Sequence, residues 1–119
     1  MKTFKINNKF IYFGSNAKEN TELVKLYREY NPNGLWFHLS DQSSSHGFYL
    51  ENEELDKDEI RIIGNILLKL SKVISKNNKM DICLLKDVKT TKTHGLVIIK
   101  NEKIKVIKNI VNFNLDDYK

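Results

Sequence analysis

The residues best suited to chemistry lie in one stretch, Leu35–Leu50, with the sequence LWFHLSDQSSSHGFYL. Apolar and polar residues alternate on both sides of a serine-rich run, and this pattern predicts a β-hairpin with a polar turn. Trp36, His38 and His46 fall near one end of it. Their rings could stack on unpaired bases while imidazole and serine groups supply hydrogen bonds. Alternatively, the tryptophan belongs to the core and the histidines fix the turn, because buried residues of these types usually pack or pair.

Metal and catalytic sites are not predicted. His38, His46, His94 and Cys83 are ligand types for zinc, but no CxxC or HxxxH pair organises them. Ser45 and His46 are adjacent, so on a strand their side chains point to opposite faces and cannot form a nucleophile–base pair. The cysteine lies in an apolar segment, where burial makes a thiol unreactive. We therefore expect a non-enzymatic protein without a cofactor.

Length and composition predict one domain, residues 1–119, because a chain of 119 residues is large enough for one core and too short for two. No apolar run is long enough to span a membrane, and the N-terminus lacks the apolar stretch of a signal peptide. The single cysteine excludes a disulfide framework and fits a reducing compartment. The expected location is the cytoplasm, with no membrane partner.

Positive charge is concentrated in the second half of the chain. The net charge is +5 overall, with 7 basic and 10 acidic residues up to position 59 and 13 basic and 5 acidic residues after it. A basic half favours a polyanionic partner such as nucleic acid. Of the 20 basic residues 18 are lysine, so a lysine-rich genome composition explains the same charge equally well.

The first half contains signals for a hairpin and a helix. Two strands, at 4–6 and 10–13, flank Asn7-Asn8, which tolerates turn conformations. Asn16 and Glu19 have the spacing of a capping box, which predicts a helix over 17–29. Its expected buried side consists of Leu23, Leu26, Tyr27 and Tyr30.

A second helix is predicted from the capping box of Asp56 and Glu59 to Lys76, with a stop at Asn77-Asn78. Helical spacing gives it a buried side of Ile60, Ile63, Leu67, Leu70 and Ile74. The side expected to face solvent holds Arg61, Asn65, Lys69, Lys72 and Lys76.

The remaining segments predict strands around a basic loop. A buried strand is expected at 81–85, followed by the polar loop 86–94. Residues 96–99 are apolar on both faces and predict a central strand, whereas 104–107 predict a strand with one wet, basic face. The last segment, 109–119, could begin a short helix. These elements predict an α+β fold, a compact single domain with a mostly antiparallel sheet and two helices.

The order of motifs resembles the NFACT-R family. The resemblance rests on a strand that ends in glycine before an asparagine-rich helix start (Phe13–Leu23), a Trp-Phe-His strand (Leu35–His38) and a Ser-His strand (Ser44–His46). It covers about residues 10–111 and favours the stand-alone branch, although the coiled-coil tail of that branch is absent. It implies a nucleic-acid-binding, non-catalytic domain linked to translation and ribosome quality control.

Together these signals predict a nucleic-acid-binding module, with RNA (tRNA or rRNA) as the main partner. A helix N-terminus favours a phosphate, the hairpin offers rings and hydroxyls, and lysines hold the backbone. Reliance on lysine instead of arginine predicts recognition of shape or backbone. The predicted binding residues are Asn16, Lys18, Asn20, Trp36, His38, Ser45, His46, Lys86, Lys89 and Lys92. The alternatives are DNA binding and a protein-interaction adaptor that contacts ribosome-associated factors through the apolar edge of the hairpin.

Overall fold

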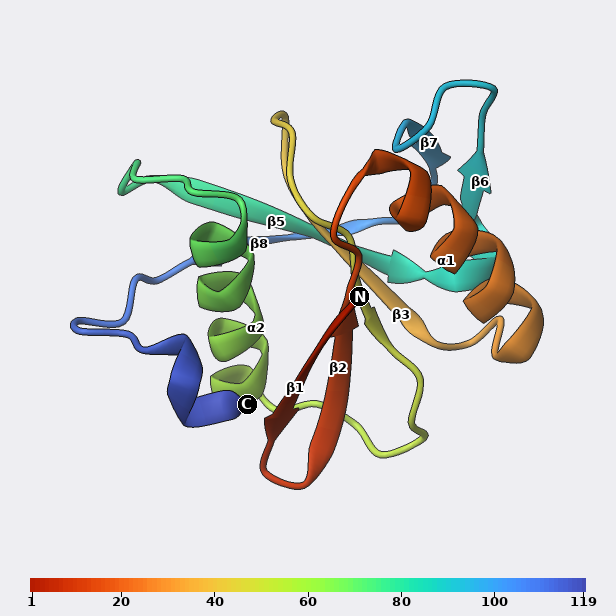
Figure 1. Ribbon diagram of the computed structural model, residues 1–119. Coiled ribbons are helices and arrows are strands. Elements are labelled where there is room, and N and C mark those ends of the chain that lie inside the picture. Colours follow the sequence, from red (N-terminus) through yellow and green to blue (C-terminus); the bar gives the residue numbers. More distant parts are fainter.

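The computed structural model describes residues 1–119 (Figure 1). Its helices are α1 (Ala17–Tyr30), α2 (Lys57–Leu70) and the short 3-10 helices η1 (Leu85–Asp87) and η2 (Leu115–Tyr118). Its strands are β1 (Lys2–Ile6), β2 (Lys9–Phe13), β3 (Leu35–Leu39), β4 (Gly47–Tyr49), β5 (Asn78–Leu84), β6 (Val88–Thr90), β7 (Val97–Ile99) and β8 (Lys103–Ile107).

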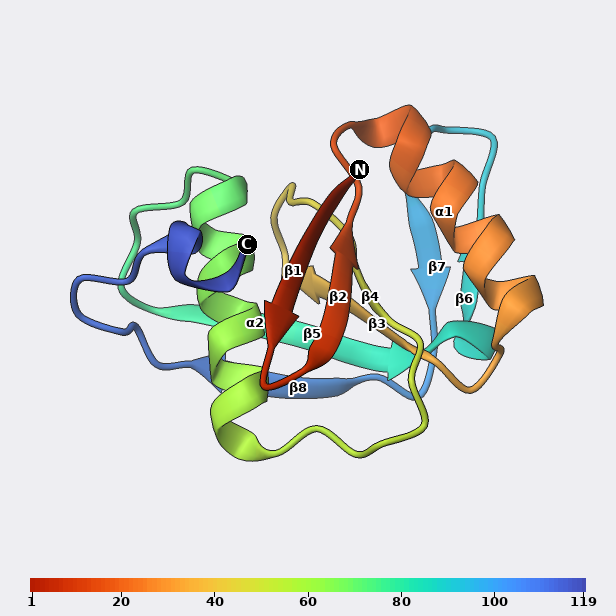
Figure 2. The same cartoon turned by 60° about the horizontal axis from the view of Figure 1, so that its bottom comes forward.

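The strands form one six-stranded antiparallel sheet, in the order β1-β2-β4-β3-β5-β8, and a separate antiparallel pair, β6-β7. Helix α2 covers one face of the large sheet, and α1 lies with the small pair on the other (Figure 2). The prediction of an α+β fold with a mostly antiparallel sheet and two helices is confirmed. Neither helix has the length and apolar character needed to cross a bilayer.

Strand β3 supplies both hydrophobic cores because its side chains alternate between the two faces. Phe37 and Leu39 belong to the larger core under α2, while Trp36 belongs to the smaller core under α1. The predicted central hairpin is confirmed, since Trp36 of β3 pairs with Phe48 of β4. It has no free edge, however, because β2 and β5 pair with its two outer sides. Docking of a partner on that edge is therefore excluded.

Helix α1 begins as predicted, but its buried side is different. The Asn16 side chain accepts the Glu19 N–H at 2.9 Å, whereas the Glu19 carboxylate accepts the N–H of Ser15 in place of that of Asn16. Leu26 and Tyr30, expected to be buried, are 58% and 74% exposed. Leu23 is buried as predicted, and Tyr27 packs half-buried against the small core, whereas the other buried residues of the helix lie in its first half: Asn20, Thr21 and Val24.

Helix α2 has the predicted capping box but ends at Leu70, six residues before the predicted end. Lys72 takes a left-handed conformation (φ 56°) that stops the helix early, and Ile74 beyond it is 96% exposed. Asn65, expected to face solvent, is buried. Its amide donates to the carbonyl of Lys108, and its oxygen accepts the N–H of Ile110. The chain after β8 thus covers the side of α2 that was predicted to be exposed to solvent.

The segment after β5 departs most from the prediction. The expected loop 86–94 contains η1 and β6, and 96–99, expected at the centre of the sheet, pairs only with β6 in the small sheet. The pair covers the α1 core, against which Val97 and Ile99 pack. Strand β8 lies at the sheet edge and exposes apolar Ile104 and Val106 together with its lysines. The final segment forms only the short η2, which packs on the larger core.

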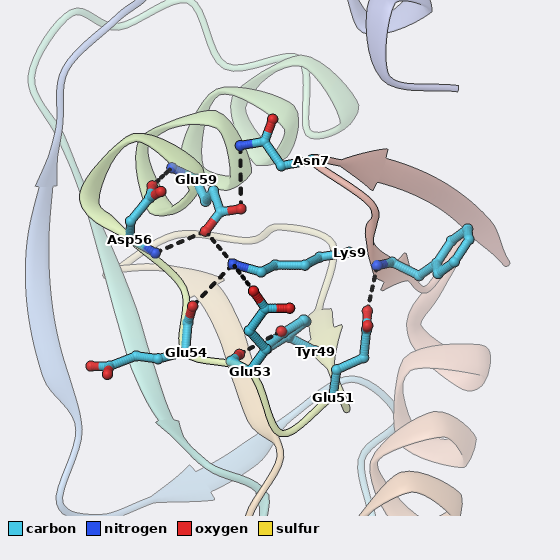
Figure 3. Close-up of polar contacts among 9 residues, drawn as sticks. Asn7, Lys9, Tyr49, Glu51, Glu53, Glu54, Asp56 and Glu59 are labelled. Atoms are coloured by element: carbon cyan, nitrogen blue, oxygen red, sulfur yellow. Dashed lines mark hydrogen bonds and ion pairs between the residues drawn. The ribbon is translucent and has the colours of Figure 1, made fainter.

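A buried ion pair joins the first hairpin to α2 (Figure 3). The ammonium of Lys9 donates to Glu59 Oε1 at 2.7 Å and to the carbonyl of Glu54 at 3.0 Å. Glu59 Oε1 also accepts the N–H of Asp56, and its Oε2 accepts the side-chain amide of Asn7 at 3.3 Å. One carboxylate therefore completes the helix cap and fixes the β1-β2 turn over it.

The pKa values of this pair favour the charged forms. Burial raises the pKa of Glu59, but hydrogen bonds from Lys9, the Asp56 backbone and Asn7 outweigh it, and the net pKa lies below its ordinary value. The hydrogen bond to Glu59 raises the pKa of Lys9. Both groups are therefore ionised at neutral pH, and neither can lose its partner without leaving a buried charge.

We expect Lys9→Met to lower the free energy of unfolding clearly, because the buried Glu59 carboxylate loses its cation. Lys9→Met combined with Glu59→Gln should recover part of that loss, since no buried charge remains. The matched control is Lys119→Met, which breaks an exposed pair with Asp116 of similar length, 2.8 Å, and should change stability little. Urea unfolding measures all three. Equal effects of the two lysine substitutions would contradict this role of the buried pair.

Candidate functional site

A pocket of about 870 Å³ opens on the α1 face of the large sheet. It lies between the start of α1, the serine-rich turn after β3 and the turn between β6 and β7; Figure 1 shows the first two side by side at the top of the molecule. Six of the ten predicted binding residues line it: Asn16, Asn20, Trp36, His38, Ser45 and His46. The helix start and the hairpin thus both contribute to one pocket.

The four predicted lysines do not line the pocket. The backbone N–H of Lys86 donates to the carbonyl of Pro32, which places Lys86 at the far end of β3 from the serine turn. Lys89 is exposed on β6, opposite Ile98. Lys18 and Lys92, by contrast, are close in sequence to Ala17 and His94 of the pocket lining. The prediction of one continuous basic loop over 86–94 is wrong, because Lys86 lies in η1 and Lys89 lies in β6.

His46 connects three parts of the pocket wall. The indole N–H of Trp36 donates to His46 Nδ1 at 3.1 Å, and His46 Nε2 lies 3.1 Å from the carbonyl oxygen of Gly95. Indole can only donate and a carbonyl can only accept, so His46 must carry its single proton on Nε2. Burial, with a smaller contribution from His38, lowers the pKa of His46 to about 3. A second proton would have to sit on Nδ1, where it would point at the indole N–H. The ring therefore stays neutral.

Trp36 and His46 were predicted to offer their rings for base stacking, but both rings are buried. Trp36 and His46 are each 1% exposed, so neither offers an open face on which a base could stack. His38 is partly exposed and lies against Trp36 with parallel rings, 5.4 Å between centroids and 4° between planes. Burial lowers the pKa of His38 as well. The interpretation that Trp36 is a core residue is therefore correct, and His38 is the hairpin ring that a ligand can reach.

Two glycines allow the pocket walls to approach. A Cβ on Gly14 would lie 1.8 Å from the side-chain oxygen of Asn20, and that oxygen accepts the N–H of His46 at 3.5 Å. Gly95 has a φ of +80°, which favours glycine, and a Cβ there would lie 3.0 Å from that of Ala17. The N–H of Gly95 donates to the Thr21 hydroxyl at 2.7 Å. The β6-β7 turn is thus fixed to α1 through Thr21 and to the hairpin through His46.

The lining contains two carboxylates, from Asp41 and Asp81, and no lysine or arginine. Asp81 lies on β5 opposite His38 of β3, and its Oδ1 accepts the Ser40 hydroxyl at 2.7 Å. The pocket itself therefore suits groups that donate hydrogen bonds, and a phosphate would have to lie outside it.

Sequence reasoning missed several lining residues, among them Asp81, Gly95, Ser71 and Ile99. Asp81 reaches the pocket through the β3-β5 register, Gly95 and Ile99 through the β6-β7 pair, and Ser71 from the C-terminal end of α2. None of these placements leaves a local signal in the sequence. The Gly95 position had a weak signal, since His94-Gly95 interrupts the polar loop before an apolar strand.

No group of three or more histidine, cysteine, aspartate and glutamate side chains is arranged to hold a metal ion. Burial raises the pKa of Cys83 to about 12, so its thiol stays protonated and is a poor nucleophile.

No family model and no curated protein matches this chain. Among solved structures, the C-terminal part of the fibronectin/fibrinogen-binding protein from Streptococcus suis matches with a TM-score of 0.84 and 19% sequence identity, over 99% of this chain. The chain spans about half the length of that solved chain, 48%. At this identity the similarity establishes a shared fold and nothing about ligands.

We expect stability to fall as the pH drops through the pKa of unfolded histidine, 6.5, toward the folded value of about 3 for His46. Across that window the unfolded chain binds a proton that the folded chain excludes, which costs about 1.4 kcal/mol per pH unit. Between pH 6.5 and 5 the loss from His46 is about 2 kcal/mol, and His38 adds to it.

His46→Phe should flatten this dependence while lowering stability at pH 7 by about 1–3 kcal/mol, since the buried Trp36 N–H loses its acceptor. His94→Gln, at an exposed histidine, serves as the control and should keep the wild-type slope. Urea unfolding at several pH values measures both. A His46→Phe protein with an unchanged slope would show that His46 is protonated in the folded state.

Proposed function

We propose that this chain is a non-enzymatic RNA-binding module of the NFACT-R type that acts in the cytoplasm in translation or ribosome quality control. The observation that carries the proposal is the pocket of about 870 Å³ in which the helix start and the two hairpin histidines meet. These are the segments on which the resemblance to that family rests.

The pocket geometry supports binding of an unpaired nucleotide. Its volume exceeds that of a single base, and the partly exposed His38 offers an aromatic edge backed by Trp36. Sequence-specific RNA recognition commonly places splayed-out bases against aromatic rings, with hydrogen bonds to their edges. Serine hydroxyls of the turn and the amide of Asn20 supply such bonds. Single-stranded segments of tRNA or rRNA present bases in this form.

The charge distribution supports contacts to the RNA backbone outside the pocket. Lys18 directly follows the lining residue Ala17, and Lys92 precedes the lining residue His94 by two positions, so these two are the predicted lysines nearest in sequence to the pocket. Lysine acts as a point charge with no bidentate geometry, so these contacts fix position without reading sequence. DNA offers the same phosphates and lacks the 2′-hydroxyl, so a comparison of RNA with DNA tests whether the module distinguishes the two.

The proposal is tested by salt-dependent binding to single-stranded RNA, tRNA and duplex DNA, measured by fluorescence anisotropy. We expect tighter binding to the two RNAs than to the duplex. Substituting Lys18 and Lys92 by Gln should flatten the plot of log affinity against log salt by about 0.7 for each phosphate that the variant no longer neutralises.

The matched control removes the same charge at Lys86 and Lys89, which lie away from the pocket, and should change the slope less. The proposal would be contradicted if all three nucleic acids bound weakly and equally and both double variants changed the slope by the same amount. Such a result would show that the binding is non-specific electrostatic attraction to lysines.

A second candidate function, that of a protein-interaction adaptor, is favoured by an exposed aromatic groove between β2 and the end of α1. This groove, of about 560 Å³, is lined by Phe10, Tyr12, Leu26, Tyr27, Tyr30, Leu50 and Glu51. Exposed aromatic clusters of this kind are typical of protein contacts. The structural neighbour is described as a fibronectin/fibrinogen-binding protein, but the proposal of an adaptor rests on the groove.

If the groove is an interaction surface, ribosome-associated proteins should remain bound to the immobilised chain after nuclease treatment, and Leu26→Glu should abolish that binding. Val111→Glu, at a similarly exposed apolar residue elsewhere on the chain, should leave it intact. Loss of all bound proteins on nuclease treatment would contradict the adaptor function and would leave RNA as the partner.

A further inference from the structure

The polarity of the pocket excludes a phosphate from its interior. Asp41 and Asp81 both line it, and no lysine or arginine side chain balances their charge there. Bringing a phosphate beside two carboxylates is unfavourable because like charges repel across a short distance. The part of a ligand that enters must therefore be uncharged and must offer hydrogen-bond donors to the carboxylates.

Asn20 adds a buried donor that faces the cavity. The residue is 5% exposed and lines the pocket. Its Oδ1 must be the atom next to the backbone N–H of His46, because an N–H needs an acceptor. Its Nδ2 then has no acceptor within the protein. Every fully buried side-chain polar atom of the chain has a hydrogen-bond partner, so this nitrogen must be accessible. The amide nitrogen therefore borders the cavity, where a carbonyl oxygen of a ligand would accept from it.

His38 provides a flat wall between these polar groups. Trp36 covers one face of its ring and His46 meets it edge-on, with 5.0 Å between centroids and 89° between planes. The remaining surface of the imidazole borders the pocket, and Asp81 lies opposite it on the neighbouring strand. A planar ligand that stacks or abuts on His38 thus brings its edge to the Asp81 carboxylate.

We infer that this pocket binds a guanine base from single-stranded RNA, an inference that rests on the proposed function. Guanine carries two adjacent donors, N1–H and the N2 amino group, which a single carboxylate such as that of Asp81 accepts together. Its O6 and N7 are acceptors for the Asn20 amide. Adenine instead presents the acceptor N1 beside its amino group, and N1 would meet the carboxylate unfavourably. Hypoxanthine lacks the N2 amino group and loses one of the two bonds.

The test uses the nucleosides guanosine, inosine and adenosine, which carry no phosphate and therefore remove the contribution of the lysines. Trp36 is the only tryptophan of the chain and stacks on His38, so its fluorescence and its indole N–H signal in NMR report on the pocket. We expect guanosine to bind about ten-fold or more tightly than inosine or adenosine, the ratio that one charge-assisted hydrogen bond provides.

Asp81→Asn should remove this preference while keeping the fold, because asparagine still accepts the Ser40 hydroxyl. Asp117→Asn, at an exposed aspartate in η2, is the control and should bind guanosine as the wild type does. His38→Phe should keep guanosine binding through its ring, whereas His38→Ala should weaken it.

The outcomes separate this inference from the proposed function. RNA binding in the salt titration together with equal affinity for the three nucleosides, or with an Asp81→Asn protein that keeps the preference, would overturn the guanine site alone. Guanosine selectivity without any RNA binding would overturn the proposed function and support a site for free nucleosides.

Discussion

One imidazole, that of His46, holds together the face of this molecule that carries the pocket. It accepts from the indole of Trp36 in the small core and bonds the carbonyl of Gly95 in the β6-β7 turn, and its backbone N–H meets Asn20 of α1. Only a neutral imidazole with its proton on Nε2 makes both ring bonds at once, because Nδ1 must be unprotonated to accept from the indole. Without this link the small sheet would be attached to the hairpin chiefly by apolar packing, and the pocket would lose a defined wall.

The rest of the fold makes that arrangement rigid from the opposite side of the sheet. The larger core packs α2 against the same strands that carry the pocket residues, so Phe37 under α2 and Trp36 under α1 are neighbours on β3. The Lys9–Glu59 pair then fixes the first hairpin to the start of α2 (Figure 3). The hydrogen bonds around the pocket thus join segments to a sheet that is already fixed by its core. The pocket is therefore preformed.

Turns and helix caps could be predicted because they depend on local sequence signals. Features that depend on pairing between distant segments could not. The Asn7-Asn8 turn and the Asp56–Glu59 cap were predictable because each is encoded within a few residues. The early end of α2 at Leu70 was not predictable, since the left-handed residue that follows, Lys72, is a lysine, which carries no stop signal. Likewise, the apolar run 96–99 fits a central strand as well as a small sheet over a core. Asp81 enters the pocket only through the β3-β5 register, which no local pattern specifies.

The central question is therefore whether RNA binds in the pocket formed around His46 or on another surface. An NMR titration of the isotope-labelled chain with a short single-stranded RNA tests this residue by residue. The account predicts that the largest shifts fall on residues 15–20, 41–46 and 93–99, with the indole N–H of Trp36 among them. Shifts confined to the aromatic groove around Leu26 and Tyr30, or spread evenly over exposed lysines, would contradict it.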